Sequence, residues 1–278
     1  MSDLASPLTL STRLRAGETV FDFWTTLPHP AIIQTIARAG FRSLTCDFQH
    51  GVYDFEGFIN VVAAAAAFNM SVTVRVPFKD HPLASRVLDA GAGAVIMPMV
   101  NSATDAQALV AATKFPPVGA RSWGPHTAAT FSGLDRTQYL HRANEFTLCF
   151  AMIETEEALE HLDRIVATPG IDGLFISPDD LSVAITHGRH VEATHPPIIA
   201  LLEKALLVTL RHGKFAGIFV GNAEQAREYA RRGFKFISMG TDLGFLKRAA
   251  ESALNHAKNG LEPIGNSGPK AAVSAKTA

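Results

Sequence analysis

The sequence predicts a (β/α)8 barrel, the TIM barrel fold, formed by a single domain over residues 1–258. Eight short apolar segments alternate with helical segments, and no change of composition marks a linker between domains. The chain has 278 residues, and barrels of this class commonly run to about 250 residues as one domain. A doubly wound open sheet is the alternative. Gly91 and Gly93 do not support its dinucleotide site, because they lead from a helix into a strand.

The predicted strands are short, apolar and rich in β-branched or aromatic residues. They cover residues 20–24, 43–47, 71–76, 94–97, 149–153, 173–176, 215–220 and 235–239.

The predicted helices lie between these strands, with Gly40 and Gly91 as C-terminal stops and Ser102 as an N-cap. Apart from the helix that joins the fifth and sixth strands, they cover residues 30–39, 55–69, 82–90, 102–115, 137–144, 197–212, 224–232 and 242–257. Three segments are expected to be irregular: the polar residues 1–17, a long and therefore functional loop at 116–136, and a loop at 187–197. The tail, residues 259–278, is expected to be disordered.

Composition and charge describe an ordinary globular protein, with 47% hydrophobic and 18% charged residues. A net charge of −1 gives no footprint for nucleic acid or an anionic membrane. Cys46 and Cys149 lie in apolar runs and are expected to be free, buried thiols in a reducing compartment. The N-terminus has no signal-peptide pattern, and no apolar run could span a bilayer, so we expect a cytoplasmic protein.

Two carboxylates follow consecutive predicted strands, Glu154 after the fifth and Asp180 after the sixth. Strands of a βαβ unit are parallel, so both carboxylates emerge at the same edge of the sheet. Each carboxylate alone is more simply explained as a helix cap or first-turn acid. Together, without Cys or His beside them, they favour a site for a hard divalent cation such as Mg²⁺ or Mn²⁺.

Other polar residues fall at the same predicted edge, where the chemistry of such barrels takes place. His50 follows the second strand and is the candidate general base, although it could also cap the next helix. Arg75 lies near the end of the third strand and could hold a carboxylate or stabilise an enolate, or form a structural ion pair. Asp89 ends a helix and, from the residues alone, is a surface acid. No lysine ends a predicted strand, which disfavours a Schiff-base mechanism.

The sequence resembles the HpcH/HpaI aldolase family, the metal-dependent class II pyruvate aldolases typified by 4-hydroxy-2-oxo-heptane-1,7-dioate aldolase. The resemblance spans about residues 15–254. It rests on motifs in this order: DFQHG at 47–51, VRVP at 74–77, RVLDAGA at 86–92, MPMV at 97–100, FPPVGAR at 115–121, IET at 153–155 and FISPDDLS at 175–182.

The resemblance implies a role for each candidate. Glu154 and Asp180 match the metal ligands, with a bound 2-oxo acid and water completing the shell. His50 matches the catalytic base, and Asp89 matches the acid that supports it, which replaces the surface interpretation. Arg75 matches the residue that stabilises the enolate. The implied substrate-binding residues are Trp24, Arg75, Met152, Ser177, Pro178, Asp179 and Asp180.

Four residues depart from the family pattern. Gln49 stands where Glu is frequent, Met152 where a substrate-contacting Gln is common, Asp179 where Ala is usual, and Ser122 where Gly follows the loop arginine. The metal ligands and the base are kept, so the general chemistry is expected to be kept. Met152 cannot donate a hydrogen bond to the bound 2-oxo acid. The preferred 2-oxo acid and the preferred aldehyde therefore stay open, and hydroxypyruvate is one candidate for the 2-oxo acid.

The implied activity is reversible cleavage of a 4-hydroxy-2-oxo acid into pyruvate, or a related 2-oxo acid, and an aldehyde through a metal-stabilised enolate. The implied cofactor is Mg²⁺ or Mn²⁺, with Co²⁺ as a further candidate, and the implied assembly is a homohexamer. The alternatives are a decarboxylase or CoA-ester lyase with the same metal site, or a non-catalytic 2-oxo acid binding protein. The sequence shows no basic cluster for a CoA nucleotide, and binding alone would not require His50 with its supporting acid.

Overall fold

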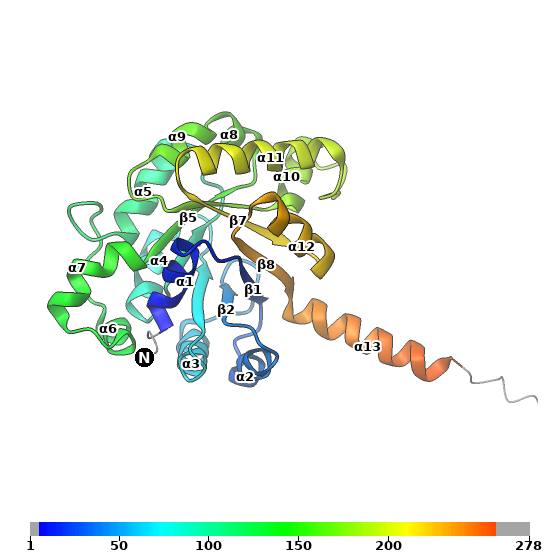
Figure 1. The fold of residues 1–278 in the computed structure, drawn as a ribbon, viewed down its shortest axis with the longest axis horizontal. Coiled ribbons are helices and arrows are strands. Elements are labelled where there is room, and N and C mark those ends of the chain that lie inside the picture. The colour runs from blue at the N-terminus through cyan, green and yellow to red at the C-terminus, as the bar shows by residue number, and fades with distance from the viewer. Residues whose placement is uncertain (1–5, 260–278) are drawn as a thin grey trace, which may run out of the picture. The chain divides into compact units, whose positions relative to one another are not determined.

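The computed structural model describes residues 6–259 as eight parallel strands closed into a barrel, with helices around it (Figure 1). Each strand pairs with the next in the chain, and β8 pairs with β1. The predicted (β/α)8 fold is thus confirmed. The strands are β1 (Val20–Thr25), β2 (Ser43–Asp47), β3 (Ser71–Arg75), β4 (Ala94–Met97), β5 (Leu148–Ile153), β6 (Gly173–Ile176), β7 (Phe215–Val220) and β8 (Phe236–Thr241).

The helices follow the predicted order with small changes of boundary. They are α1 (Ser6–Arg15), α2 (Pro30–Arg38), α3 (Phe55–Ala66), α4 (His81–Asp89), α5 (Ala103–Thr113), α6 (His126–Ser132), α7 (Arg136–Phe146), α8 (Glu156–Glu160), α9 (Leu162–Ala167), α10 (Pro178–Ile185), α11 (Pro196–Arg211), α12 (Ala223–Arg232) and α13 (Asp242–Lys258).

Contacts divide the chain into two compact units, residues 1–243 and 244–278. The barrel lies in the first unit, and the extension of the domain to residue 258 stays a prediction. Of the tail predicted to be disordered, all but Asn259 lies outside the described residues. Within residues 6–259, no helix combines the length and the apolar character needed to cross a bilayer.

The prediction of an irregular N-terminal segment was wrong, because residues 6–15 form the helix α1. Leu10 and Leu14, one turn apart, are buried with Val20, Leu148 and Phe236. The last three lie at the starts of β1, β5 and β8, so α1 closes the N-terminal end of the barrel. Three leucines in a polar segment, only two of them one helical turn apart, are too weak a helical pattern to reveal this role.

The segment 116–136, predicted to be a loop, contains the short helix α6, which ends at Gly133 in the left-handed conformation (φ 66°). Its surroundings form a separate apolar cluster that includes Phe115, Tyr139 and Phe146. The ring of Trp123 packs on Phe115 with centroids 5.4 Å apart. The segment is therefore held by aromatic packing, which a composition rich in Gly and Pro does not reveal.

Large aromatic side chains fill the barrel interior where two strands carry glycine. The ring of Phe236 lies 5.4 Å from that of Phe150 and 5.7 Å from that of Phe175. A Cβ atom at Gly217 would stand 2.7 Å from the Phe175 ring, and one at Gly173 would stand 2.6 Å from Phe150. These two glycines of β6 and β7 therefore provide the room for the rings.

A carboxylate, Asp22 of β1, is also buried inside the barrel. It accepts hydrogen bonds from the hydroxyl groups of Ser43, Thr45 and Ser238, each at 2.7 Å. Burial raises the pKa of Asp22 to about 6, and the three hydroxyl donors limit that rise.

The raised pKa predicts that Asp22 makes stability depend on pH. The folded protein binds this proton more tightly than the unfolded chain, so stability falls as pH rises from about 4 to about 6. The loss is at most about 3 kcal/mol, from a shift of about two pKa units. In Asp22→Asn this pH-dependent fall in the free energy of unfolding should disappear. Urea unfolding of both proteins between pH 4 and pH 7 measures it, and parallel stability curves would contradict the prediction.

Asp242 links the C-terminal ends of β8 and β1, the two strands that close the barrel, through hydrogen bonds. Its carboxylate accepts from the backbone N–H groups of Thr26 and Leu27, both at 2.9 Å, and from the hydroxyl groups of Thr25 and Thr26 at 3.0 and 2.6 Å. Asp242 is 7% exposed. The residue that directly follows β8 thus fixes the loop that leaves β1.

The two cysteines are free and buried, as predicted. Burial raises the pKa of both thiols, that of Cys149 to about 12. Both thiols therefore stay protonated and act as small apolar side chains.

Candidate functional site

A cavity of about 260 Å³ opens at the C-terminal ends of the strands. Seven of the eight strands, all but β4, contribute to it through their last residues or the loops that follow. Its lining consists of Trp24, Thr26, Asp47, His50, Arg75, Met152, Ser177, Asp179, Asp180, Phe219 and Thr241.

Asp47 and Arg75 form an ion pair in this lining, and both are buried. The parallel register of β2 and β3 places the two residues side by side. The Arg75 guanidinium donates to both carboxylate oxygens, from Nε at 2.9 Å and also from Nη2. It lies 4.8 Å from the ring centre of Trp24, whose indole N–H donates to Asp47 at 3.2 Å. Burial alone would raise the pKa of Asp47, but the bonds and charge of Arg75 hold it below its usual value.

Asp47 also holds the loop that carries His50. Its Oδ1 accepts from the backbone N–H groups of Gln49 at 3.0 Å and His50 at 3.2 Å. The His50 ring reaches the Gln49 side chain, with their Nε2 atoms 3.2 Å apart. One carboxylate therefore orients both the guanidinium and the imidazole loop. The sequence predicted Asp47 at the end of a strand but gave it no role; an acid and an arginine at the ends of adjacent strands were the available signal.

We predict that Asp47→Asn lowers kcat by up to about 10²-fold, the effect of displacing a catalytic group by about 1 Å. The asparagine amide has no negative charge to attract the Arg75 guanidinium. It also has one oxygen acceptor instead of two, so the two parallel hydrogen bonds cannot both form. Steady-state kinetics at a measured Tm test this, with Asp163→Asn as a control on the surface, where the acid is 67% exposed. Equal kinetics in both variants would contradict a positioning role.

Glu154 is not among the residues that line the cavity, and it is 5% exposed. It accepts a hydrogen bond from the backbone N–H of Met99 at 2.7 Å. Burial and the charge of Asp180 raise its pKa to about 7, against the opposing effects of Met99 and Arg75. Asp180, in the first turn of α10, accepts from the Ser177 hydroxyl.

These two acids are a fitting donor set for a hard divalent cation, because a bound cation would relieve their burial and mutual repulsion. In the described part of the chain, no group of three or more His, Cys, Asp or Glu side chains could hold a metal ion. The pair would leave the remaining coordination positions to water and substrate.

Three of the predicted site residues do not line the cavity. Glu154 is buried and bonded to Met99, and Pro178 lines a neighbouring cavity. Asp89 accepts a hydrogen bond from Arg121 Nη2 at 2.6 Å, and this arginine lies over the ring of Phe115. The support of His50 by Asp89 stays a prediction. The other candidates line the cavity together: Trp24, His50, Arg75, Met152, Ser177, Asp179 and Asp180. The sequence interpretation assigned no role to Thr26, Phe219 or Thr241.

Lysine is absent from the described lining of the cavity. The buried Lys114 bonds to the backbone carbonyl of Thr147, just before β5, and so lies at the other end of the barrel.

Comparison with known proteins gives a consistent result. The family model described as HpcH/HpaI aldolase/citrate lyase matches residues 21–249. A hydroxypyruvate/pyruvate aldolase from Pseudomonas aeruginosa is 34% identical over 248 residues, which cover 89% of this chain and 92% of the relative. A 4-hydroxy-2-oxo-heptane-1,7-dioate aldolase from Klebsiella pneumoniae is 33% identical, over 86% of this chain and 89% of the relative.

Among solved structures, an HpcH/HpaI aldolase from Desulfitobacterium hafniense superposes with a TM-score of 0.86 at 28% identity. The match covers 92% of this chain and all of the other. Family model, sequence relatives and structure agree over nearly the whole barrel. The chain therefore belongs to the HpcH/HpaI aldolase/citrate lyase family, a family of carbon–carbon lyases.

Proposed function

We propose that the protein reversibly cleaves a 4-hydroxy-2-oxo acid into pyruvate, or a close 2-oxo acid such as hydroxypyruvate, and an aldehyde. The observation that carries the proposal is the cavity itself. It brings a base, His50, a fixed guanidinium, Arg75, and one of two paired carboxylates, Asp180, to one place. The relatives named as aldolases for such substrates support the same reaction.

In the cleavage direction His50 removes the proton of the 4-hydroxyl group. The electron pair of that O–H bond forms the aldehyde carbonyl as the C3–C4 bond breaks. The pair from the broken bond moves into the 2-oxo group and leaves an enolate, whose charge the Arg75 guanidinium shares. Protonation at C3 then yields the 2-oxo acid. Asp47 keeps the guanidinium in place through both steps by its two hydrogen bonds.

Glu154 and Asp180 would hold the divalent cation, Mg²⁺ or Mn²⁺, with Co²⁺ as a further candidate. When bound, the cation acts as a Lewis acid on the 2-oxo group and supplies several kcal/mol of charge stabilisation. Oxygen ligands alone suit these hard ions.

The lining argues against a CoA-ester substrate. Its described residues include one arginine, Arg75, and no lysine, and that arginine is already paired with Asp47. Binding a nucleotide with its phosphates would need further cations. A small 2-oxo acid needs no such surface.

The test of the proposed function is exchange of the C3 protons of pyruvate for deuterium, followed by NMR. Exchange should be absent in EDTA and should appear when Mn²⁺ or Mg²⁺ is added back. Glu154→Gln should abolish the metal-dependent exchange, whereas the exposed Glu224→Gln should keep it. Absence of exchange with every metal, for pyruvate and hydroxypyruvate alike, would reject the proposal.

The roles of Asp89 and of the hexamer belong to the same proposal, and the family resemblance supports both. If Asp89 raises the basicity of His50, Asp89→Asn should lower kcat/KM and shift the limb of the pH–rate profile that reports the base. An unchanged profile would remove Asp89 from this role. Light scattering of the purified protein tests the hexamer directly.

A further inference from the structure

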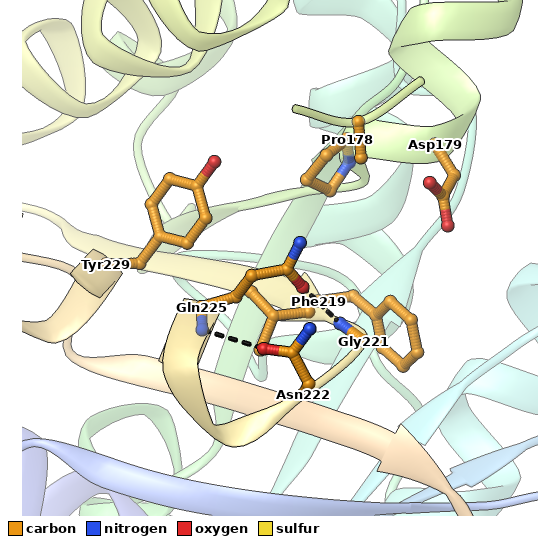
Figure 2. Close-up of a pocket in the computed structure, with 9 residues that line it drawn as sticks. Pro178, Asp179, Phe219, Gly221, Asn222, Gln225 and Tyr229 are labelled. Carbon is orange, nitrogen blue, oxygen red and sulfur yellow. Dashed lines mark hydrogen bonds between the residues drawn. The ribbon is translucent and has the colours of Figure 1, made fainter. Parts of the chain in front are cut away.

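A second cavity, of about 200 Å³, lies beside the catalytic one (Figure 2). Asp179 and Phe219 line both cavities. The Phe219 ring packs edge-on against Trp24 of the catalytic cavity, with ring centres 5.3 Å apart. The two cavities are thus neighbours that share a carboxylate and an aromatic side chain in their linings.

One wall of the second cavity presents oriented amide groups. The Gln225 Oε1 accepts from the backbone N–H of Gly221 at 2.9 Å, and the Asn222 Oδ1 accepts from the backbone N–H of Gln225 at 2.9 Å. Because each carbonyl oxygen is fixed in this way, the NH₂ group is the free end of each amide. Figure 2 shows the Gln225 nitrogen pointing toward the side of the cavity on which Pro178 lies.

Tyr229 adds a hydroxyl group to this wall. Its ring is buried and packs edge-on against Phe234 at 5.5 Å. Burial raises the pKa of Tyr229, so the hydroxyl stays protonated and able to donate. Its oxygen points to the same side of the cavity as the Gln225 nitrogen (Figure 2).

Asp179 supplies the opposite chemistry, a carboxylate that accepts hydrogen bonds. No lysine, arginine or histidine belongs to the described lining of this second cavity. An anionic group would therefore meet the Asp179 charge without a compensating cation. Hydroxyl groups suit both walls, since each can donate to the carboxylate and accept from an amide or phenol.

We propose that the second cavity binds the uncharged, hydroxylated end of the aldehyde acceptor. The inference rests on the proposed aldol reaction and names the substrate class: aldehydes that carry hydroxyl groups beyond the carbonyl carbon. It also gives a reason for Asp179, which stands where the family usually has alanine. A substrate such as a 4-hydroxy-2-oxo-heptane-1,7-dioate would place its second carboxylate beside the Asp179 carboxylate, and the two negative charges would repel each other.

The test uses three acceptors of equal carbon number with pyruvate as donor: erythrose, which is hydroxylated, butanal, which is apolar, and succinic semialdehyde, which is anionic. The enzyme should show a kcat/KM for erythrose about tenfold or more above those for the other two, the effect of one or two hydrogen bonds. Ratios between acceptors within one protein cancel any general loss of activity.

Three variants locate the effect. Gln225→Leu removes the amide, and Tyr229→Phe removes the hydroxyl; each should lower the erythrose-to-butanal ratio about 3- to 10-fold. Gln225→Glu keeps an oxygen for the Gly221 N–H but places a charge in the cavity. It should lower the ratio of succinic semialdehyde to butanal. The control is Glu224→Gln, an exposed neighbour outside the lining, which should leave every ratio unchanged.

The outcomes separate the two proposals. Donor exchange that is intact, with acceptor ratios unchanged in all three cavity variants, would overturn the acceptor site and leave the aldol reaction standing. Equal kcat/KM for the three acceptors in the unaltered enzyme would overturn it as well. Absence of donor exchange would overturn the aldol reaction and with it the acceptor site.

Discussion

Replacement of His50 by alanine is expected to lower kcat by about 10²–10⁴, the usual span for a lost general base. The side chain lines the catalytic cavity, and the backbone N–H of His50 is fixed by Asp47. Alanine keeps that backbone bond, so the loop should stay in place while the proton acceptor is lost. Cleavage of a 4-hydroxy-2-oxo acid at saturating substrate measures the effect.

The matched control is His187→Ala, which removes an exposed histidine of the α10–α11 loop. Its rate should equal that of the unaltered enzyme. A His50→Ala rate within a factor of two of that value would assign the base to another group. Circular dichroism and Tm of both variants exclude unfolding as the cause of a lower rate.

The largest effect on stability is expected at Lys114. Its ammonium group lies within 2.6 Å of Asp172 Oδ2 and also donates to the backbone carbonyls of Asn144, at 3.1 Å, and Thr147. The side chain is 2% exposed. Lys114→Met would leave Asp172 and two carbonyl groups without this donor, although Asp172 would keep the backbone N–H of Cys149. The loss is expected to be about 3–5 kcal/mol, as for other buried pairs broken on one side.

Urea unfolding of Lys114→Met against Lys204→Met, an exposed lysine of α11, measures this loss. A double-mutant cycle with Asp172→Asn separates the pair from the carbonyl contacts. A loss below about 1 kcal/mol would place Lys114 with ordinary surface pairs. Activity per folded molecule should be unchanged, because Lys114 lies at the barrel end opposite the cavity.

The strand pattern was readable from the sequence because barrel strands are short, apolar and separated by turn residues. The bounds of β2, β4, β6 and β7 agree with those predicted. Two helices were not readable. The sequence of α1 has three leucines, of which only Leu10 and Leu14 are one helical turn apart. The helix α6 lies in a segment whose Gly and Pro content argues for a loop. In both cases tertiary packing outweighs local propensity.

The site was readable where a residue's chemistry and its place after a strand coincide, as for His50 and Arg75. Asp47 was missed because its importance depends on strand register, which sets it beside Arg75. The second cavity was invisible for a similar reason, since it joins Asp179 to Gln225 and Tyr229 of a different helix. A single sequence carries no direct sign of such pairings.

The hydrogen bonds between Asp242 and residues 25–27 have a consequence for biosynthesis. The partners of Asp242 at residues 25–27 leave the ribosome more than 210 positions earlier. At about 5–20 residues per second, this corresponds to a delay of about 10–40 s. For most of that interval the nascent chain carries His50 and Arg75 but lacks β8, the strand that closes the barrel. The finished catalytic cavity, which includes Thr241, therefore forms only after β8 has been made.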